Sequence, residues 1–215
     1  MRALWITVGL LTLQLMASEA ARATVIVDPA GDALAVFGAP GPLIDIDTVT
    51  AVISGSELQV SVTFHTPIAP ASVGAANSLR GGFDFDFDRN PLTGDPPLQM
   101  FFSPPFVTLD FGSDVSVDFF SELVHPGFID VFDNLTLTLI DVIPVTFTAT
   151  SASYAIPLSL LNVNGPFYFT AAFGTFDQPT DALDVRGTVP EPSTLLLLPL
   201  GIFVLILIGR RPTRQ

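Results

Sequence analysis

Apolar and polar side chains alternate in short runs along most of the chain. The clearest run is Glu57–His65, in which every second residue up to Phe64 is apolar. A period of two is typical of a β-strand that buries one of its faces. The preceding segment, Ile44–Ile53, alternates in part, and Gly55-Ser56 stands between the two. We therefore expect a β-hairpin over these residues.

Runs rich in Val, Ile, Thr and Phe recur through residues 24–185, separated by Pro, Gly, Asn and Asp, and no long helical period is visible. Many short strands, with turn signals every roughly 8–12 residues, favour an all-β fold: an antiparallel β-sandwich of the jelly-roll kind. Each sheet of such a fold has one face on the core and one in water. The other expected strands are 24–27, 83–88, 98–102, 106–111, 115–119, 128–132, 135–140, 145–150, 154–156, 167–172 and 183–185, with a turn of helix at 157–161.

Three phenylalanines alternate with three aspartates over residues 83–88. A strand would place all three rings on one face, in the core, and all three carboxylates on the other, toward water or a loop. The rings belong to Phe83, Phe85 and Phe87, and the carboxylates to Asp84, Asp86 and Asp88.

Side chains with oxygen atoms continue beyond this strand. Oxygen ligands at alternate positions of a loop are how calcium is bound in many proteins. However, Pro91 and Pro97 stand where an EF-hand loop needs a glycine and a bidentate glutamate. Two interpretations stay open: a calcium site, or an acidic strand face that is solvated. The candidate ligands are Asp86, Asp88, Asn90 and Asp95, with Asp28 and Asp32 as a second acidic group, and no other cofactor is expected.

Composition narrows the possible chemistry. Eight basic against 21 acidic residues give a formal net charge of −13, which argues against a nucleic-acid partner. The lack of cysteine excludes disulfides, thiolate-bound zinc and a cysteine nucleophile. His65 and His125 lie in no His-Glu-x-x-His motif, and no Gly-x-Ser-x-Gly motif occurs. We predict no catalytic residues and no enzymatic activity; a glycosidase, which needs only two carboxylates, is the enzymatic alternative.

The N-terminus has the three parts of a secretory signal peptide. Arg2 precedes an apolar run, and Ala21-Arg22-Ala23 supplies an Ala-x-Ala cleavage site. We expect cleavage after Ala23 and export of the remainder.

The C-terminus carries a second apolar segment. Pro190-Glu191-Pro192 precedes the 14 residues Leu195–Ile208, and Arg210 and Arg211 follow. As a helix this run measures about 21 Å, which is short for a bilayer core of about 30 Å. The arginines would keep the end of the chain in the cytoplasm. The segment therefore predicts a marginal membrane anchor.

The order of a Pro-Glu-Pro motif, a short apolar helix and an arginine cluster resembles the PEP-CTERM protein-sorting signal. The resemblance implies a Gram-negative bacterium that makes an exopolysaccharide, and processing of the tail by exosortase, a membrane transpeptidase-like enzyme. The protein would be anchored transiently in the inner membrane and then reach the cell surface or extracellular matrix. A permanent single-span anchor is the alternative.

Short pieces of the central region resemble DOMON-like and carbohydrate-binding β-sandwiches. They are Asp28–Asp32, Ile44–Ile46 before the hairpin, Asp86–Gly94 and the closing segment Ala172–Asp184. We expect a non-catalytic surface or matrix protein associated with exopolysaccharide; the alternative is a carbohydrate-binding module, stabilised by calcium.

The expected parts of the chain are a signal peptide at 1–23, the β-sandwich at 24–185, a linker with the Pro-Glu-Pro motif at 186–194, a transmembrane sorting helix at 195–209 and a basic cytoplasmic tail at 210–215.

Overall fold

The computed structural model describes residues 23–33, 43–71, 77–95, 110–119, 124–163, 165–175, 178–183 and 185–190. They belong to one compact unit, Arg22–Pro190. The described residues form strands and one 3-10 turn, so the expectation of an antiparallel all-β domain is confirmed. The strands are β1 Thr24–Val27, β2 Ile46–Ser54, β3 Glu57–Phe64, β4 Arg80–Asp86, β5 Val115–Asp118, β6 Phe128–Asp133, β7 Thr138–Phe147, β8 Ser151–Pro157, β9 Phe167–Thr175, β10 Gln178–Ala182 and β11 Gly187–Val189, and the 3-10 turn is Leu158–Leu160.

Several predicted segments lie outside the described residues. They include the signal peptide apart from Ala23, the C-terminal helix at 195–209, the basic tail, and the expected strands at 98–102 and, for the most part, 106–111. Within the described part of the chain, no helix is long and apolar enough to cross a bilayer.

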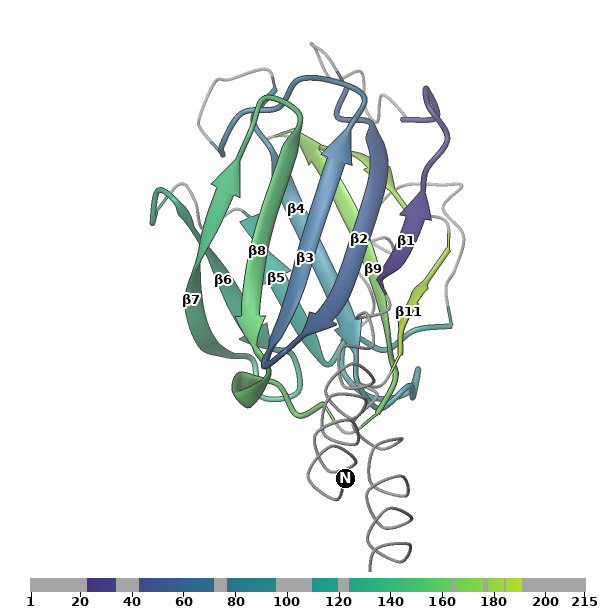
Figure 1. Ribbon diagram of the computed structural model, residues 1–215, viewed down its shortest axis with the longest axis vertical. Coiled ribbons are helices and arrows are strands. Elements are labelled where there is room, and N and C mark those ends of the chain that lie inside the picture. The colour runs from purple at the N-terminus through teal and green to yellow at the C-terminus, as the bar shows by residue number, and fades with distance from the viewer. Residues whose placement is uncertain are drawn as a thin grey trace, which may run out of the picture. The chain divides into compact units, whose positions relative to one another are not determined.

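The strands form one antiparallel sheet in the order β1-β2-β3-β8-β7-β6-β5-β4-β9-β10, and β11 also pairs with β9. The sheet folds over on itself, so that β2, β3 and β8 face β4, β5 and β9 across the core (Figure 1). Its two ends almost meet, because β1 lies beside β11 and the hydroxyl of Thr24 donates a hydrogen bond to the carbonyl of Thr188. The sheet is therefore nearly closed, with features of both a barrel and a sandwich.

Strand β7 joins the two layers by changing partner along its length. Its residues up to Pro144 pair with β6, and Val145–Phe147 pair with β8. Proline has no N–H to donate to a ladder, so the pairing of β7 with β8 ends where Pro144 begins.

The prediction of two separate strands at 135–140 and 145–150 is wrong. Thr138–Phe147 is one strand, and residues 134–137 form the turn before it. Leu135 and Leu137, whose alternation suggested a core face, are exposed, and Leu137 has a φ of 54°. The turn is set by a polar contact instead: the N–H of Thr136 donates to the carboxylate of Asp133 at 2.9 Å.

Aromatic rings fill the space between the layers. Phe83 of β4 contacts Tyr154 of β8 edge to face, with ring centroids 5.6 Å apart. Phe64 of β3 meets Phe173 of β9 in the same way at 5.4 Å. Phe119, just after β5, packs against both Tyr154 and Phe173. Edge-to-face pairs add to the free energy gained by burying the rings, so this cluster is the centre of the core.

The prediction for β4 is half right. Phe83 and Phe85 are fully buried, as expected, and Phe87 packs against the core. The aspartates were expected to face water or a loop. Asp84 and Asp86 do not face water, since they are 2% and 0% exposed. Their carboxylates instead accept hydrogen bonds from loop residues, Ser113 and Asn90. Consecutive residues of β4 from Gly82 to Asp86 are all buried, so both faces of the strand are covered in this part.

The end of the sheet also differs from the expectation. Residues 183–185, predicted as a strand, separate β10 from β11. Gly187–Val189 falls in the segment expected as a linker but forms β11, in which Val189 pairs with Phe167. The compact unit therefore runs to Pro190.

Replacing a phenylalanine at the centre of the core should lower the free energy of unfolding strongly. Phe83→Ala is expected to lower the free energy of unfolding by about 3–5 kcal/mol, the usual cost of emptying a buried phenylalanine site. Phe128→Ala is the matched control, because that ring is 42% exposed. Chemical denaturation of the full chain in mild detergent measures both, and equal losses would contradict the assignment of the core.

Candidate metal centre

Three aspartates come together where β4 ends and β5 begins. Phe85 of β4 pairs with Val115 of β5 in antiparallel register, so the adjoining residues Asp86 and Asp114 come next to each other. Asp88 follows two residues later. Carboxylate oxygens of Asp86, Asp88 and Asp114 all lie within 4.8 Å of one another. We call these three residues the β4–β5 acidic cluster.

Backbone N–H groups hold these carboxylates in place. One oxygen of Asp114 accepts hydrogen bonds from the N–H groups of Phe87, at 2.8 Å, and Asp88, at 3.2 Å. One oxygen of Asp88 accepts from the N–H of Asn90 at 2.8 Å and from the hydroxyl of Thr93 at 3.0 Å. The loop after β4 is therefore folded around its own acidic side chains.

Two carboxylate oxygens in the cluster have no hydrogen-bond partner. They are Oδ2 of Asp86, a fully buried residue, and Oδ1 of Asp114, a residue 8% exposed. Burial, together with the neighbouring carboxylates of Asp114 and Asp88, raises the pKa of Asp86 to about 6. Burial also raises the pKa of Asp114, with smaller contributions from Asp88 and Asp133. Asp86 and Asp114 thus hold carboxyl groups away from water, next to the exposed carboxylate of Asp88.

A pocket of about 310 Å³ opens beside the cluster. Asp88, Asp114 and Asp133 supply its acidic part, while Phe87 and Leu160 are among its apolar lining. Asp88 is exposed and Asp114 reaches this space from below the surface, so small solutes have access to the cluster.

The residues proposed from sequence divide into two groups. Asp86 and Asp88 belong to the cluster. Asn90 uses its side-chain oxygen to accept from the N–H of Leu92 at 3.1 Å. Asp95 pairs with Ser113 through backbone hydrogen bonds, and its carboxylate is not part of the group.

Asp114 was missed because it lies 28 positions beyond Asp86 in the sequence. The only signal that could have found it is the pairing of the two alternating strands on either side. That pairing is a tertiary contact, which a local spacing pattern does not contain.

A second acidic group joins the segment after β1 to β10. Asp28, Asp32 and Asp181 have carboxylate oxygens within 4.8 Å of one another. One oxygen of Asp181 accepts from the N–H of Ile46 at 2.6 Å, which ties β10 to the start of β2. Burial, followed by the charges of Asp32 and Asp45, raises the pKa of Asp181 to about 7.

The two histidines are isolated from these groups. His65, just after β3, has its Nε2 3.6 Å from a carboxylate oxygen of Asp47. His125, in the turn before β6, has its Nδ1 3.8 Å from a carboxylate oxygen of Asp130. Neither forms a side-chain hydrogen bond with a described serine or threonine, the contact that a serine-type hydrolase requires.

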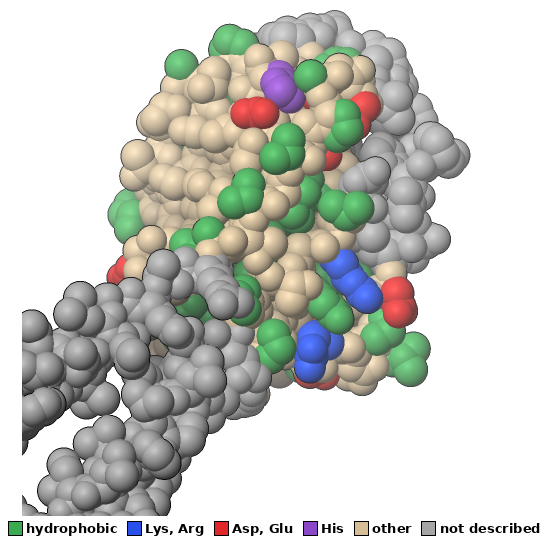
Figure 2. Space-filling model, turned by 45° about the vertical axis from the view of Figure 1, so that its right-hand side comes forward, with side chains coloured by type: hydrophobic (Ala, Val, Ile, Leu, Met, Phe, Trp, Pro, Cys, Tyr) green, Lys and Arg blue, Asp and Glu red, His purple; other side chains and the backbone are tan. Residues whose placement is uncertain are grey.

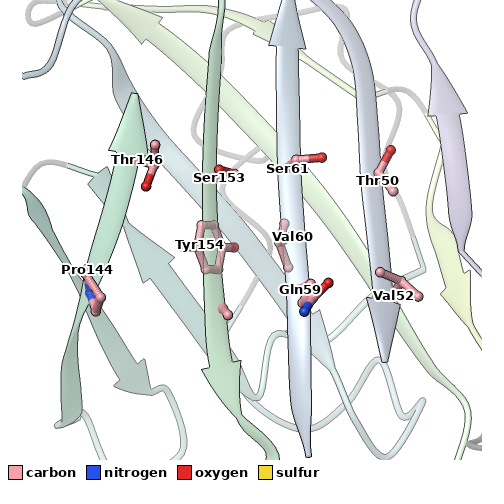
Figure 3. Close-up of a pocket in the computed structure, with 10 residues that line it drawn as sticks. Thr50, Val52, Gln59, Val60, Ser61, Pro144, Thr146, Ser153 and Tyr154 are labelled. Carbon is pink, nitrogen blue, oxygen red and sulfur yellow. The ribbon is translucent and has the colours of Figure 1, made fainter. Parts of the chain in front are cut away.

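A shallow depression of about 420 Å³ lies on the outer face of β2, β3, β8 and β7. The strand register places four hydroxyl side chains in a row across it, one from each strand (Figure 3). Gln59 adds an amide on the next row, while Tyr154 is turned into the core and is only 6% exposed. The four hydroxyl residues are Thr50, Ser61, Ser153 and Thr146.

The face that includes β1 and β11 is different in character. Figure 2 shows it as mostly uncharged, with hydrophobic side chains scattered over it and few basic ones. Arg186 is stacked on the ring of Tyr168, with its guanidinium carbon 4.1 Å from the ring centroid. That tyrosine ring is thereby covered by an arginine of the same chain.

No family model matches the chain, and no curated protein is significantly similar to it. Of the residues in the Pro-Glu-Pro and arginine motifs, Pro190 alone is described; Glu191, Pro192, Arg210 and Arg211 lie outside the described residues.

The buried carboxyl group of Asp181 should make stability depend on pH. Its pKa is about 7 in the folded protein and 3.8 ordinarily, so between these values the folded state holds a proton that the unfolded state has lost. Raising the pH through this window should therefore destabilise the protein. Thermal melts with a chelator present should show the decline.

Asp181→Asn is expected to make this decline shallower. Asp141→Asn changes the net charge equally at an exposed position and should leave the slope as in the wild type. Equal slopes in all three proteins would contradict the role of Asp181.

Proposed function

We propose that this is an exported, exosortase-sorted protein of the cell surface or extracellular matrix of a Gram-negative bacterium, without catalytic activity. The observation that carries the proposal is the order of three features at the C-terminus: Pro190-Glu191-Pro192, a 14-residue apolar run and Arg210-Arg211. The N-terminus adds the pattern of a secretory signal peptide. Because no family model matches, the assignment rests on these residues alone.

The position of the last strand supports a removable tail. β11 ends at Val189, which is fully buried and paired with Phe167. The compact unit ends at the next residue, Pro190. Cleavage near the Pro-Glu-Pro motif would therefore leave every described strand intact.

The described polar groups support a non-catalytic role. The two histidines each face a single aspartate, without a hydroxyl nucleophile. The carboxylates that do converge are held by backbone N–H groups at strand ends. Such contacts stabilise loops and suit a structural role.

A second candidate is a carbohydrate-binding module with a DOMON-like or jelly-roll sandwich. The depression on the β2–β3–β8–β7 face favours it, because a row of hydroxyls and the amide of Gln59 can exchange hydrogen bonds with sugar hydroxyls. No aromatic ring is exposed in this depression, since Tyr154 points inward. Any sugar would therefore bind through polar contacts, without ring stacking.

The sorting proposal predicts two processed ends. Mass spectrometry of the protein recovered from the cell surface should find a chain that begins at Thr24 and lacks Leu195–Gln215. A strain without its exosortase should retain the C-terminal peptide in the membrane fraction. Recovery of Leu195–Gln215 from mature surface material would show that the tail is a permanent anchor.

The carbohydrate-binding candidate has its own test. Ser61→Arg should fill the depression and weaken retention in gels containing the host exopolysaccharide by about tenfold or more. Thr138→Arg, which places the same charge at an exposed position outside the depression, should bind as the wild type does. Equal retention of both variants would rule out this surface as the binding site.

A further inference from the structure

We propose that Asp86, Asp88 and Asp114 form a calcium site that fastens the loop after β4 to the start of β5. The proposal rests on the arrangement of these three side chains, and it is independent of how the protein is sorted.

The spacing of the carboxylates fits a single ion. Calcium binds oxygen atoms at about 2.3–2.6 Å, so two ligands of one ion are at most about 5 Å apart. Ligand oxygens of the three aspartates lie within 4.8 Å of one another. The side chains are thus already at the separation that one calcium ion imposes.

The second observation is the pair of buried oxygens without a partner. Asp86 uses Oδ1 to accept from the N–H of Asn90, and Asp114 uses Oδ2 to accept from the N–H of Phe87. The other oxygen of each, Oδ2 of Asp86 and Oδ1 of Asp114, is buried with no hydrogen bond. A buried acceptor of this kind is costly unless a ligand satisfies it. The backbone contacts therefore orient both carboxylates and leave one oxygen of each to a ligand.

The charge of the cluster selects a cation. No described arginine or histidine forms an ion pair with Asp86 or Asp114, and Asp133 adds a further negative charge at the pocket. A divalent ion would neutralise two of the three negative charges in the cluster. Buried carboxylates are otherwise stable only when they are protonated or paired.

Calcium suits this site better than magnesium does. Magnesium requires a nearly ideal octahedron of close ligands, whereas calcium accepts six to eight oxygens in irregular arrangements. The pocket beside Asp88 and Asp114 has room for the waters that would complete the shell of the larger ion.

The experiment compares thermal melts of the full chain in mild detergent, with chelator, with calcium and with magnesium. At a hundredfold excess over its Kd, calcium should raise the melting temperature by about 5–10 °C. Magnesium at the same concentration screens charge equally and should have a clearly smaller effect. Equal responses to the two ions would overturn the proposal.

Asp86→Asn is the decisive variant. The asparagine keeps a side-chain oxygen that can accept from the N–H of Asn90, but it removes a buried negative charge. In chelator the variant should therefore have a higher melting temperature than the wild type. Calcium should no longer raise that melting temperature. A purely structural Asp86 would give the opposite result, with a lower melting temperature and an unchanged response to calcium.

Two further variants locate the ion. Asp32→Asn makes the same charge change in the second acidic group and should keep the calcium response; loss of the response in this variant would overturn the proposal. If Asp86→Asn does not fold, the exposed Asp88 replaces it: Asp88→Asn should raise the Kd for calcium at least about tenfold, and an unchanged Kd would overturn the site.

Discussion

The architecture depends on the burial of both faces of β4. One face carries Phe83 and Phe85 into the ring cluster between the layers, which fixes the register of the strand. The alternation that places the rings inside then places Asp84 and Asp86 on the second face, which is also covered. The segment before β5 compensates in part: the hydroxyl of Ser113 donates to Asp84 at 2.9 Å. The position of the core rings thus determines where the acidic groups must be.

Because of this constraint, the many acidic residues of the chain are not all solvated on its surface. Among the described residues six aspartates are buried, so a substantial part of their negative charge lies inside the fold and at strand ends. Each of the two acidic groups joins segments that are far apart in the sequence, as the 135-residue separation between Asp181 and Ile46 shows. Neutralisation of either group, by a proton or a cation, would therefore stabilise tertiary structure. Weak calcium sites of extracellular modules are occupied only where calcium is plentiful, which suits a protein expected to act outside the cell.

Local patterns were sufficient for part of the fold. The hairpin of β2 and β3 followed from clean alternation around Gly55, whose φ of 62° suits the turn. Alternation could not give the burial of Asp84 and Asp86, because it separates two faces without saying whether both are covered. It also suggested a strand at Leu135–Ile140, where a hydrogen bond from Thr136 to Asp133 makes a turn. Local spacing could not predict Asp114 as a member of the β4–β5 acidic cluster, because the pairing of β4 with β5 brings it next to Asp86. The burial of the aspartates and the position of Asp114 thus depend on tertiary contacts, whereas the turn at 134–137 depends on a local polar contact that alternation does not register.

The two ends of the compact unit meet at the seam that nearly closes the sheet. β1 starts at Thr24, one residue after the proposed signal-peptide cleavage, and β11 stops at Val189, one residue before the sorting motif. Thr24 itself donates to Thr188 across this seam. Both proposed processing steps would therefore act just beyond the last paired residues on either side. Trimming at these points would leave every described strand complete, since the described strands begin at Thr24 and end at Val189. Under the proposed sorting route, the domain would therefore keep its described strands before and after both processing steps.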